Sequence, residues 1–95
     1  MTYEELTNQA TKSITDFMDR AKSTDDKYVA ELCFNAAWGQ KILWRDLANL
    51  MKDQRSHLDE QLEMWHVINK QEEVFSKLVD VQSVPAMYKN ENNQL

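Results

Sequence analysis

The stretch NAAWGQKILW, residues 35–44, decides how many helices this chain contains. It holds the only glycine of the sequence, Gly39, between Trp38 and Trp44. A glycine can end a helix, but a helix end normally carries polar turn residues and a new cap after it. Here two alanines precede Gly39, and the apolar period continues behind it. The sequence therefore predicts one long helix through Gly39, with a break at this residue as the alternative.

Gly39 also lies on a row of apolar residues. Steps of three and four positions along the chain give Val29, Leu32, Ala36, Gly39, Leu43, Leu47 and Leu50. Such a row is typical of one face of a helix that packs against a core. A glycine inside a helix costs about 1 kcal/mol relative to alanine, so a packing reason for it is expected. We predict that this row is the main apolar stripe and that a second helix approaches closely at Gly39.

The composition predicts a helical fold. The 95 residues, 42% hydrophobic and 28% charged, are typical of one folded domain rather than of a disordered chain. A sheet of this size needs several tight turns, which depend on glycine. The sequence has one glycine, one proline and no Asn-Gly or Asp-Gly pair. We predict an all-α fold, either a small three-helix bundle or a helical hairpin with a long central helix.

The ends of the first two helices are marked by capping residues. Thr2 and Glu5 have the spacing of a capping box, and a row of apolar residues continues this helix to about residue 22. The segment 23–26, Ser-Thr-Asp-Asp, predicts the start of a second helix near Asp25, because these residues cap and complement a helix N-terminus. The row of the first helix comprises Tyr3, Leu6, Ala10, Ile14, Phe17 and Ala21.

A third helix is predicted from the weaker cap Ser56–Asp59 to about residue 82. Its apolar row includes Leu58, Leu62, Trp65, Ile68, Phe75, Leu78 and Val79. The junction 52–56 is expected to be a hairpin turn, although the absence of glycine and proline also allows one continuous rod. Residues 83–95 are rich in Asn and lack a period, so we predict one domain over 1–82 and a disordered, flexible tail over 83–95.

Charge and cysteine content exclude several function classes. A net charge of −5 argues against direct nucleic-acid binding, which needs clustered basic residues. No long apolar segment predicts a membrane helix, and the N-terminus lacks a signal-peptide pattern. Cys33 stands alone, so a reducing compartment and a cytoplasmic location are expected. No phosphate loop, zinc pattern or nucleophile elbow occurs, so we expect no enzyme and no cofactor.

One short part of the chain carries a local excess of positive charge and two of the tryptophans. Tryptophan and arginine are enriched among the residues that dominate protein–protein binding energy. The predicted partner-binding strip comprises Trp38, Lys41, Trp44, Arg45, Lys52 and Arg55. It would suit an acidic protein partner. The alternative is that these charges pair with neighbouring helices of the same chain.

The second helix is apolar on nearly every side between Tyr28 and Trp44, which predicts burial by other helices or by a second subunit. We therefore expect a homo-oligomer. The predicted function is a regulatory or inhibitory protein-binding module, of the kind found among phage accessory and antitoxin-like adaptors, acting through helix faces. The alternative is a self-assembling structural component with a pocket at its subunit interface.

Glu63 and His66 have the Glu-x-x-His spacing, which places a carboxylate and an imidazole on one face of a helix. With Glu31 and Trp38 before them, they follow an order that resembles the small ferritin-like proteins whose iron site forms at a subunit interface. The resemblance implies a metal-binding bundle, but Asn35 stands where a further carboxylate would help. A surface acid and a half-buried histidine are the ordinary alternative, and we assign no metal ligand.

Overall fold

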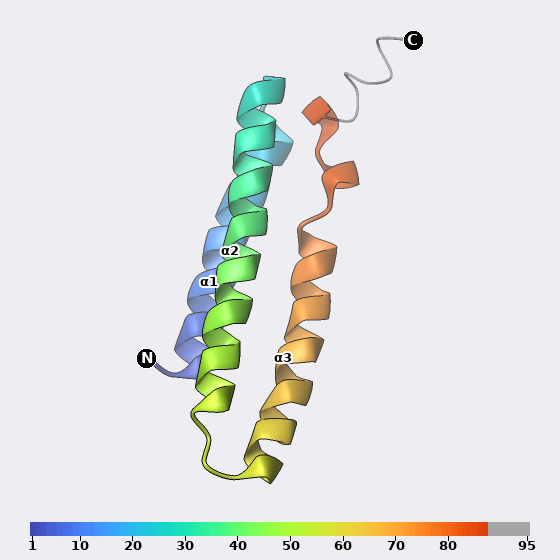
Figure 1. Cartoon of the computed structure of the whole chain (residues 1–95). Helices are drawn as coiled ribbons and strands as arrows, with labels where there is room; N and C mark the ends of the chain where they lie inside the picture. Colours follow the sequence, from blue (N-terminus) through green and yellow to red (C-terminus); the bar gives the residue numbers. More distant parts are fainter. Residues whose placement is uncertain (88–95) are drawn as a thin grey trace.

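Three long helices form an elongated bundle in the computed structural model, which describes residues 1–87 (Figure 1). They are α1 (Tyr3–Ser23), α2 (Lys27–Asp53) and α3 (Leu58–Leu78), followed by the short 3₁₀ helix η1 (Val81–Ser83). Successive helices run antiparallel, and both α1 and α3 pack against α2. The molecule measures 56 × 23 × 14 Å. The predicted all-α bundle is confirmed.

The start of α1 is the predicted capping box. The Thr2 hydroxyl accepts a hydrogen bond from the Glu5 backbone N–H at 3.0 Å, and the Glu5 carboxylate accepts one from the Thr2 N–H at 3.1 Å. This second bond, together with the Thr2 side chain and the N-terminal ammonium group, lowers the pKa of Glu5. The first helix is thereby capped by residues that the sequence identifies.

A short turn connects α1 with α2. Asp26 is the N-cap of α2, and its carboxylate accepts from the backbone N–H groups of Tyr28 and Val29. The Thr24 hydroxyl accepts from the backbone N–H of Asp26 at 3.1 Å and so supports the cap. The helix begins at Lys27, close to the predicted start near Asp25.

Gly39 lies inside α2, which continues without a break on both sides of it. Its φ angle is negative, so the residue does not form a left-handed turn. The expected close approach of another helix is wrong within residues 1–87, because Gly39 is exposed and a Cβ atom built there meets nothing of this part of the chain within 4 Å. The described part of the monomer therefore gives no packing reason for this glycine.

The buried row of α2 is displaced by about one residue from the predicted stripe. The row that faces the core comprises Ala30, Cys33, Ala37, Trp44 and Ala48. We call Val29, Leu32, Ala36, Gly39, Leu43, Leu47 and Leu50 the outer row, and each of its five large members is at least partly exposed. The prediction failed because both rows are apolar and both recur at helical spacing. The small inner side chains allow α1 to pack closely against α2.

A turn separates α2 from α3, so the alternative of one continuous rod is excluded. Gln54 ends α2, and its backbone N–H donates to the carbonyl of Leu50. The predicted cap at Ser56 is wrong, because His57 is the N-cap of α3 and makes no side-chain capping bond. The Gln61 side chain instead donates to the backbone carbonyl of Arg55 at 2.8 Å and holds the turn against the first turn of α3.

The core is centred on Trp44 of α2, whose side chain lies against residues of both α1 and α3. Its ring lies edge-on to Phe75 of α3, with 4.9 Å between ring centroids, and 6.5 Å from Tyr3 of α1. Its indole N–H donates to the Thr7 hydroxyl at 2.9 Å. A large side chain that fills a three-helix junction and has its polar atom paired is well suited to a core position.

The chain remains packed beyond the predicted domain boundary at residue 82. The Asp80 carboxylate caps η1, and Val84 and Ala86 behind it are buried in the core. Residues 83–87 therefore belong to the folded domain, and the expectation that they form a flexible tail is wrong. The segment follows α3 at the end of the bundle (Figure 1), and Val84, Ala86 and Met87 belong to the hydrophobic core cluster or pack against it. The rest of the expected tail, 88–95, lies outside the described residues.

Candidate protein-binding surfaces

Within residues 1–87, no group of three or more His, Cys, Asp and Glu side chains is arranged to hold a metal ion. None of the helices in this part of the chain is long and apolar enough to cross a membrane.

Trp44 does not belong to the predicted binding strip, because its side chain is only 1% exposed. The strip was predicted from neighbouring positions in the sequence, but Trp44 points into the core while Trp38 and Arg45 lie at the surface. Replacing Trp44 would disturb the fold rather than a contact with a partner. The prediction of Trp44 as a partner-binding residue is therefore wrong, and Trp44 is a core residue.

Two basic residues of the strip reach α3. The Arg45 guanidinium forms an ion pair with Glu72 at 2.8 Å, and the Lys41 ammonium donates to the Ser76 hydroxyl at 3.2 Å. Lys41 also lies over the ring of Trp38, 4.7 Å from its centroid. These contacts are the pairing with a neighbouring helix that the sequence left as the alternative. Part of the local positive charge is thus neutralised within the chain.

The remaining two basic residues of the strip lie apart from each other. Lys52 is partly buried near the end of α2 and pairs with Asp53 at 3.6 Å. Arg55 is exposed in the turn and borders a different hollow, which Tyr3 and Met64 also line. The structure therefore brings Trp38, Lys41 and Arg45 together along α2 and separates Arg55 from them.

Trp38 and Trp65 lie on the same side of the molecule. Trp38 shares one side of α2 with Lys41 and Arg45, since the three are spaced by about one and two helical turns. On α3, Trp65 is about two and three turns from Glu72 and Ser76, which are the partners of Arg45 and Lys41. The contacts between the two rows therefore place both tryptophans on the joint surface of α2 and α3.

We call this joint surface the tryptophan face. Trp38 is 44% exposed and Trp65 is 46% exposed. At its lower end lies a hollow of about 240 Å³ between the end of α2 and the start of α3. The face comprises Trp38, Lys41, Arg45 and Lys52 of α2 together with Leu58, Leu62 and Trp65 of α3.

Sequence reasoning missed the three α3 members of the tryptophan face. Leu58, Leu62 and Trp65 fit the apolar row of the third helix, but α3 buries Met64, Ile68 and Phe75 instead. The charged residues did contain a signal. Glu72 could have been matched with Arg45, because the acidic third helix complements the basic segment of the second.

The outer row of α2 forms a second apolar surface. Leu32 is 71% exposed, and Val29, Leu43 and Leu50 are also exposed over large parts of their side chains. The outer row is about 100° away from the inner row around the helix axis, because the two differ by one residue. It is therefore separate from the tryptophan face, which lies toward α3.

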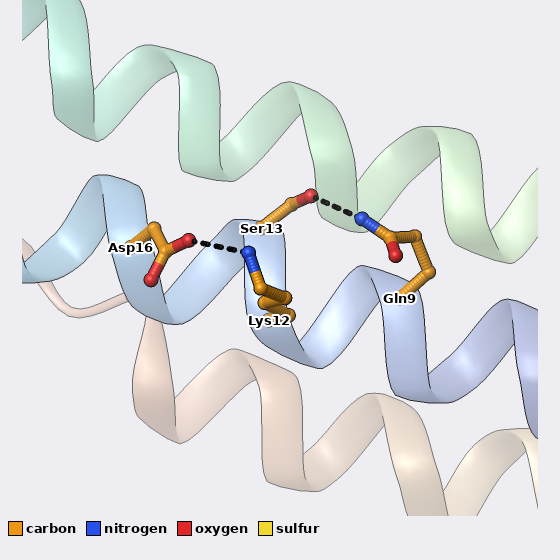
Figure 2. A network of polar contacts seen from close by, with 4 residues as sticks. All are labelled: Gln9, Lys12, Ser13 and Asp16. Carbon is orange, nitrogen blue, oxygen red and sulfur yellow. Dashed lines mark hydrogen bonds and ion pairs between the residues drawn. The ribbon is translucent and has the colours of Figure 1, made fainter.

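The outward surface of α1 is polar, in contrast to that of α2. Gln9 donates to Ser13 at 3.5 Å, and Lys12 pairs with Asp16 at 3.4 Å, so these side chains interact with one another (Figure 2). Both contacts join residues one turn apart on the same helix. This surface has the character of an ordinary solvated helix face, and we assign no site to it.

Glu63 and His66 both lie at the surface of α3. The His66 ring packs against Trp65, with 5.1 Å between ring centroids, and is exposed rather than half-buried as expected. In the part of the chain that the structure describes, neither Glu31 nor another ligand-forming side chain completes a group of three with them. The geometry adds no support to the metal-binding alternative.

The chain was compared with known protein families, with curated proteins and with solved structures, and no match was found in any of the three comparisons.

Proposed function

We propose that this chain is a small protein-binding module that regulates or inhibits another protein through contacts on its helix faces. The observation that carries the proposal is the tryptophan face, where two half-exposed indole rings and two leucines lie on one surface that no part of residues 1–87 covers. Tryptophan is enriched among the residues that dominate interface energies. Single apolar residues are normal on surfaces, but Leu58, Leu62 and Trp65 line one hollow together, and such a group indicates a contact.

The proposed occupant of the tryptophan face is an amphipathic helix of another protein. The face follows two antiparallel helices, and a third helix fits along the surface between them with its apolar residues toward Trp38 and Trp65. On the α2 side, Arg45 and Lys52 already pair with Glu72 and Asp53, but Lys41 forms no ion pair within residues 1–87. The occupant is therefore expected to carry an acidic residue near Lys41. A partner helix that is bound on the tryptophan face could not use its apolar side for other contacts, and the chain would thereby inhibit the partner protein.

Capture from a native lysate, followed by mass spectrometry, tests this function. The variant Leu62→Asp/Trp65→Ala removes two apolar contacts from the tryptophan face and should weaken capture of the bound proteins at least about tenfold. Val74→Asp is the matched control, because Val74 is also exposed and lies about two and a half turns from Trp65, on the opposite side of α3. Circular dichroism should show the same helix content for both variants. Equal capture by the double variant and the control would contradict the proposal.

A further inference from the structure

The outer row of α2 has a symmetric arrangement about the middle of the helix. Val29 and Leu50 are equally far from the point between Gly39 and Gln40, and the same holds for Leu32 and Leu47. The pair Ala36 and Leu43 obeys the same rule. This point is also close to the middle of α2, which runs from Lys27 to Asp53. When the helix is reversed about this point, the two outer pairs match in size and polarity, Ala36 exchanges with Leu43, and Gly39 exchanges with Gln40.

An antiparallel second copy of α2 would match this arrangement. In a two-fold symmetric contact, a residue at one position meets a second position in the partner chain, and the second position then meets the first in return. Val29 would lie opposite Leu50 of the second copy, and Leu32 opposite Leu47. At the central level, the large Leu43 would face the small Ala36. A parallel copy would instead place Leu43 against Leu43 and Ala36 against Ala36. The two leucines would then be crowded, and a gap would remain between the two alanines.

Gly39 supplies the second observation. Among residues 1–87, no side chain occupies the space that the missing Cβ leaves, since nothing lies within 4 Å of a Cβ atom built there. Alanine at this exposed helical position would be more stable by about 1 kcal/mol in an isolated chain. A helix that crosses α2 at its midpoint would come closest at Gly39, where the absence of a side chain lets the two backbones approach. A helix of a second chain at this position would supply the packing reason that residues 1–87 lack.

The exposed area agrees with what a stable dimer needs. If it were covered completely, the outer row together with the exposed Tyr28 would bury on the order of 700 Å² per chain, close to the roughly 800 Å² that each partner buries in a standard interface. The members with the largest exposed fractions are Tyr28 and Leu32 near one end and Leu50 near the other. The apolar surface therefore extends along most of α2 on both sides of Gly39.

We propose that the outer row binds the outer row of a second copy of this chain, with the two α2 helices antiparallel and crossing at Gly39. This dimer contact is separate from the tryptophan face, which stays exposed for the protein partner proposed above. The antiparallel direction also places the N-terminal end of each α2 beside the C-terminal end of the other, which the helix dipoles favour.

Sedimentation equilibrium on the full chain is the first test. The wild type should sediment as a reversible dimer in the micromolar range. Leu43→Asp places two charges in the symmetric contact and should raise the dissociation constant at least about a hundredfold, whereas Val74→Asp should leave it unchanged. Gly39→Leu should also dissociate the dimer while the helix content stays the same, because the monomer has open space at this position. A wild type that is monomeric at submillimolar concentration would overturn the proposal.

Disulfide trapping tests the direction of the two helices. The experiment uses the Cys33→Ala background, since Cys33 is the only native cysteine. A mixture of Leu32→Cys and Leu47→Cys chains should form a covalent dimer under mild oxidation, because the two positions lie opposite each other. Leu32→Cys alone should not, since its two copies would be about 22 Å apart along the antiparallel pair, beyond the reach of a disulfide. Efficient trapping of Leu32→Cys alone would show a parallel pair and overturn the proposal.

The two proposals fail independently. Loss of the dimer in Leu43→Asp with lysate capture intact supports the dimer contact and leaves the tryptophan face as the partner surface. A dimer that resists Leu43→Asp but dissociates in Leu62→Asp/Trp65→Ala would place self-association on the tryptophan face, and would overturn the proposed use of the outer row.

Discussion

The indole N–H of Trp44 donates a hydrogen bond of 2.9 Å to the hydroxyl of Thr7, across the interface of α2 and α1. The tryptophan has almost no exposed surface, so water has little access to this donor. The bond fixes the orientation of the largest core side chain and connects the first two turns of α1 with the second half of α2. It therefore links the position of Trp44 to the register of the α1–α2 pair.

Replacing Thr7 by valine should destabilise the fold. Valine has a similar shape but cannot accept the hydrogen bond, so the indole N–H would be left without a partner, at a cost of about 1–2 kcal/mol. Urea unfolding followed by circular dichroism measures the change. Thr11→Val is the control, because the Thr11 hydroxyl is exposed and bonds only to a backbone carbonyl of its own helix. Equal effects of the two substitutions would contradict a special role for the Thr7–Trp44 bond.

The capping box should make stability depend on pH. The pKa of Glu5 is lowered, first by the hydrogen bond from the Thr2 backbone N–H. A lowered pKa in the folded state means that the contribution of Glu5 is present above its ordinary value of 4.5 and is lost as the pH falls through the folded-state pKa. The difference in unfolding free energy between wild type and Glu5→Gln should therefore be constant near neutral pH and shrink in acid. Glu4→Gln, which removes the same charge outside the capping box, should not reproduce this profile.

Gly39→Ala should stabilise the monomer. The position is helical and exposed, and an added Cβ meets nothing, so the unfolding free energy should rise by about 0.5–1 kcal/mol. The comparison is best made in the Leu43→Asp background, where no dimer contributes, by thermal or urea unfolding. Ala36→Gly in the same background should have the opposite sign. A loss of stability in Gly39→Ala would reveal an intramolecular contact at this residue.

Val84→Ala should destabilise the domain although the residue lies behind the last long helix. Val84 is completely buried, so loss of two methyl groups and the resulting cavity should cost about 1.5–2.5 kcal/mol. The control is Val81→Ala in the adjacent 3₁₀ helix, where the side chain is 44% exposed and the cost should stay below about 0.5 kcal/mol. If both substitutions had the same small effect in urea unfolding, residues 83–87 would behave as the tail that the sequence suggested.

The first helix was predictable because only one of its faces is apolar. Leu6, Ala10 and Ile14 recur at helical spacing among polar neighbours, and all three are buried as predicted. The capping box added an independent signal at its N-terminus, and both of its hydrogen bonds are present. A helix with one apolar face and a marked end leaves little choice of orientation.

The orientation of α2 could not be predicted from periodicity. Its inner and outer rows are both apolar and differ by one position, so either could face the core. The orientation of α2 depends on which of its side chains fit against α1 and α3. The alanines of the inner row permit close packing with α1, and Trp44 fills the junction with α3, which requires the tertiary arrangement to be known. The same limit applied to the binding strip, where Trp44 and Trp38 are close in sequence but face opposite environments.

The 14 Å thickness of the molecule has a consequence for its energetics. In so thin a body most side chains have some contact with water, and sixteen apolar residues of the described range 1–87 are buried. Such a protein gains little folding free energy from its core, because this contribution grows with the fraction of surface that is buried on folding. Two chains joined along α2 would bury further apolar surface between them, and the melting temperature would then rise with protein concentration.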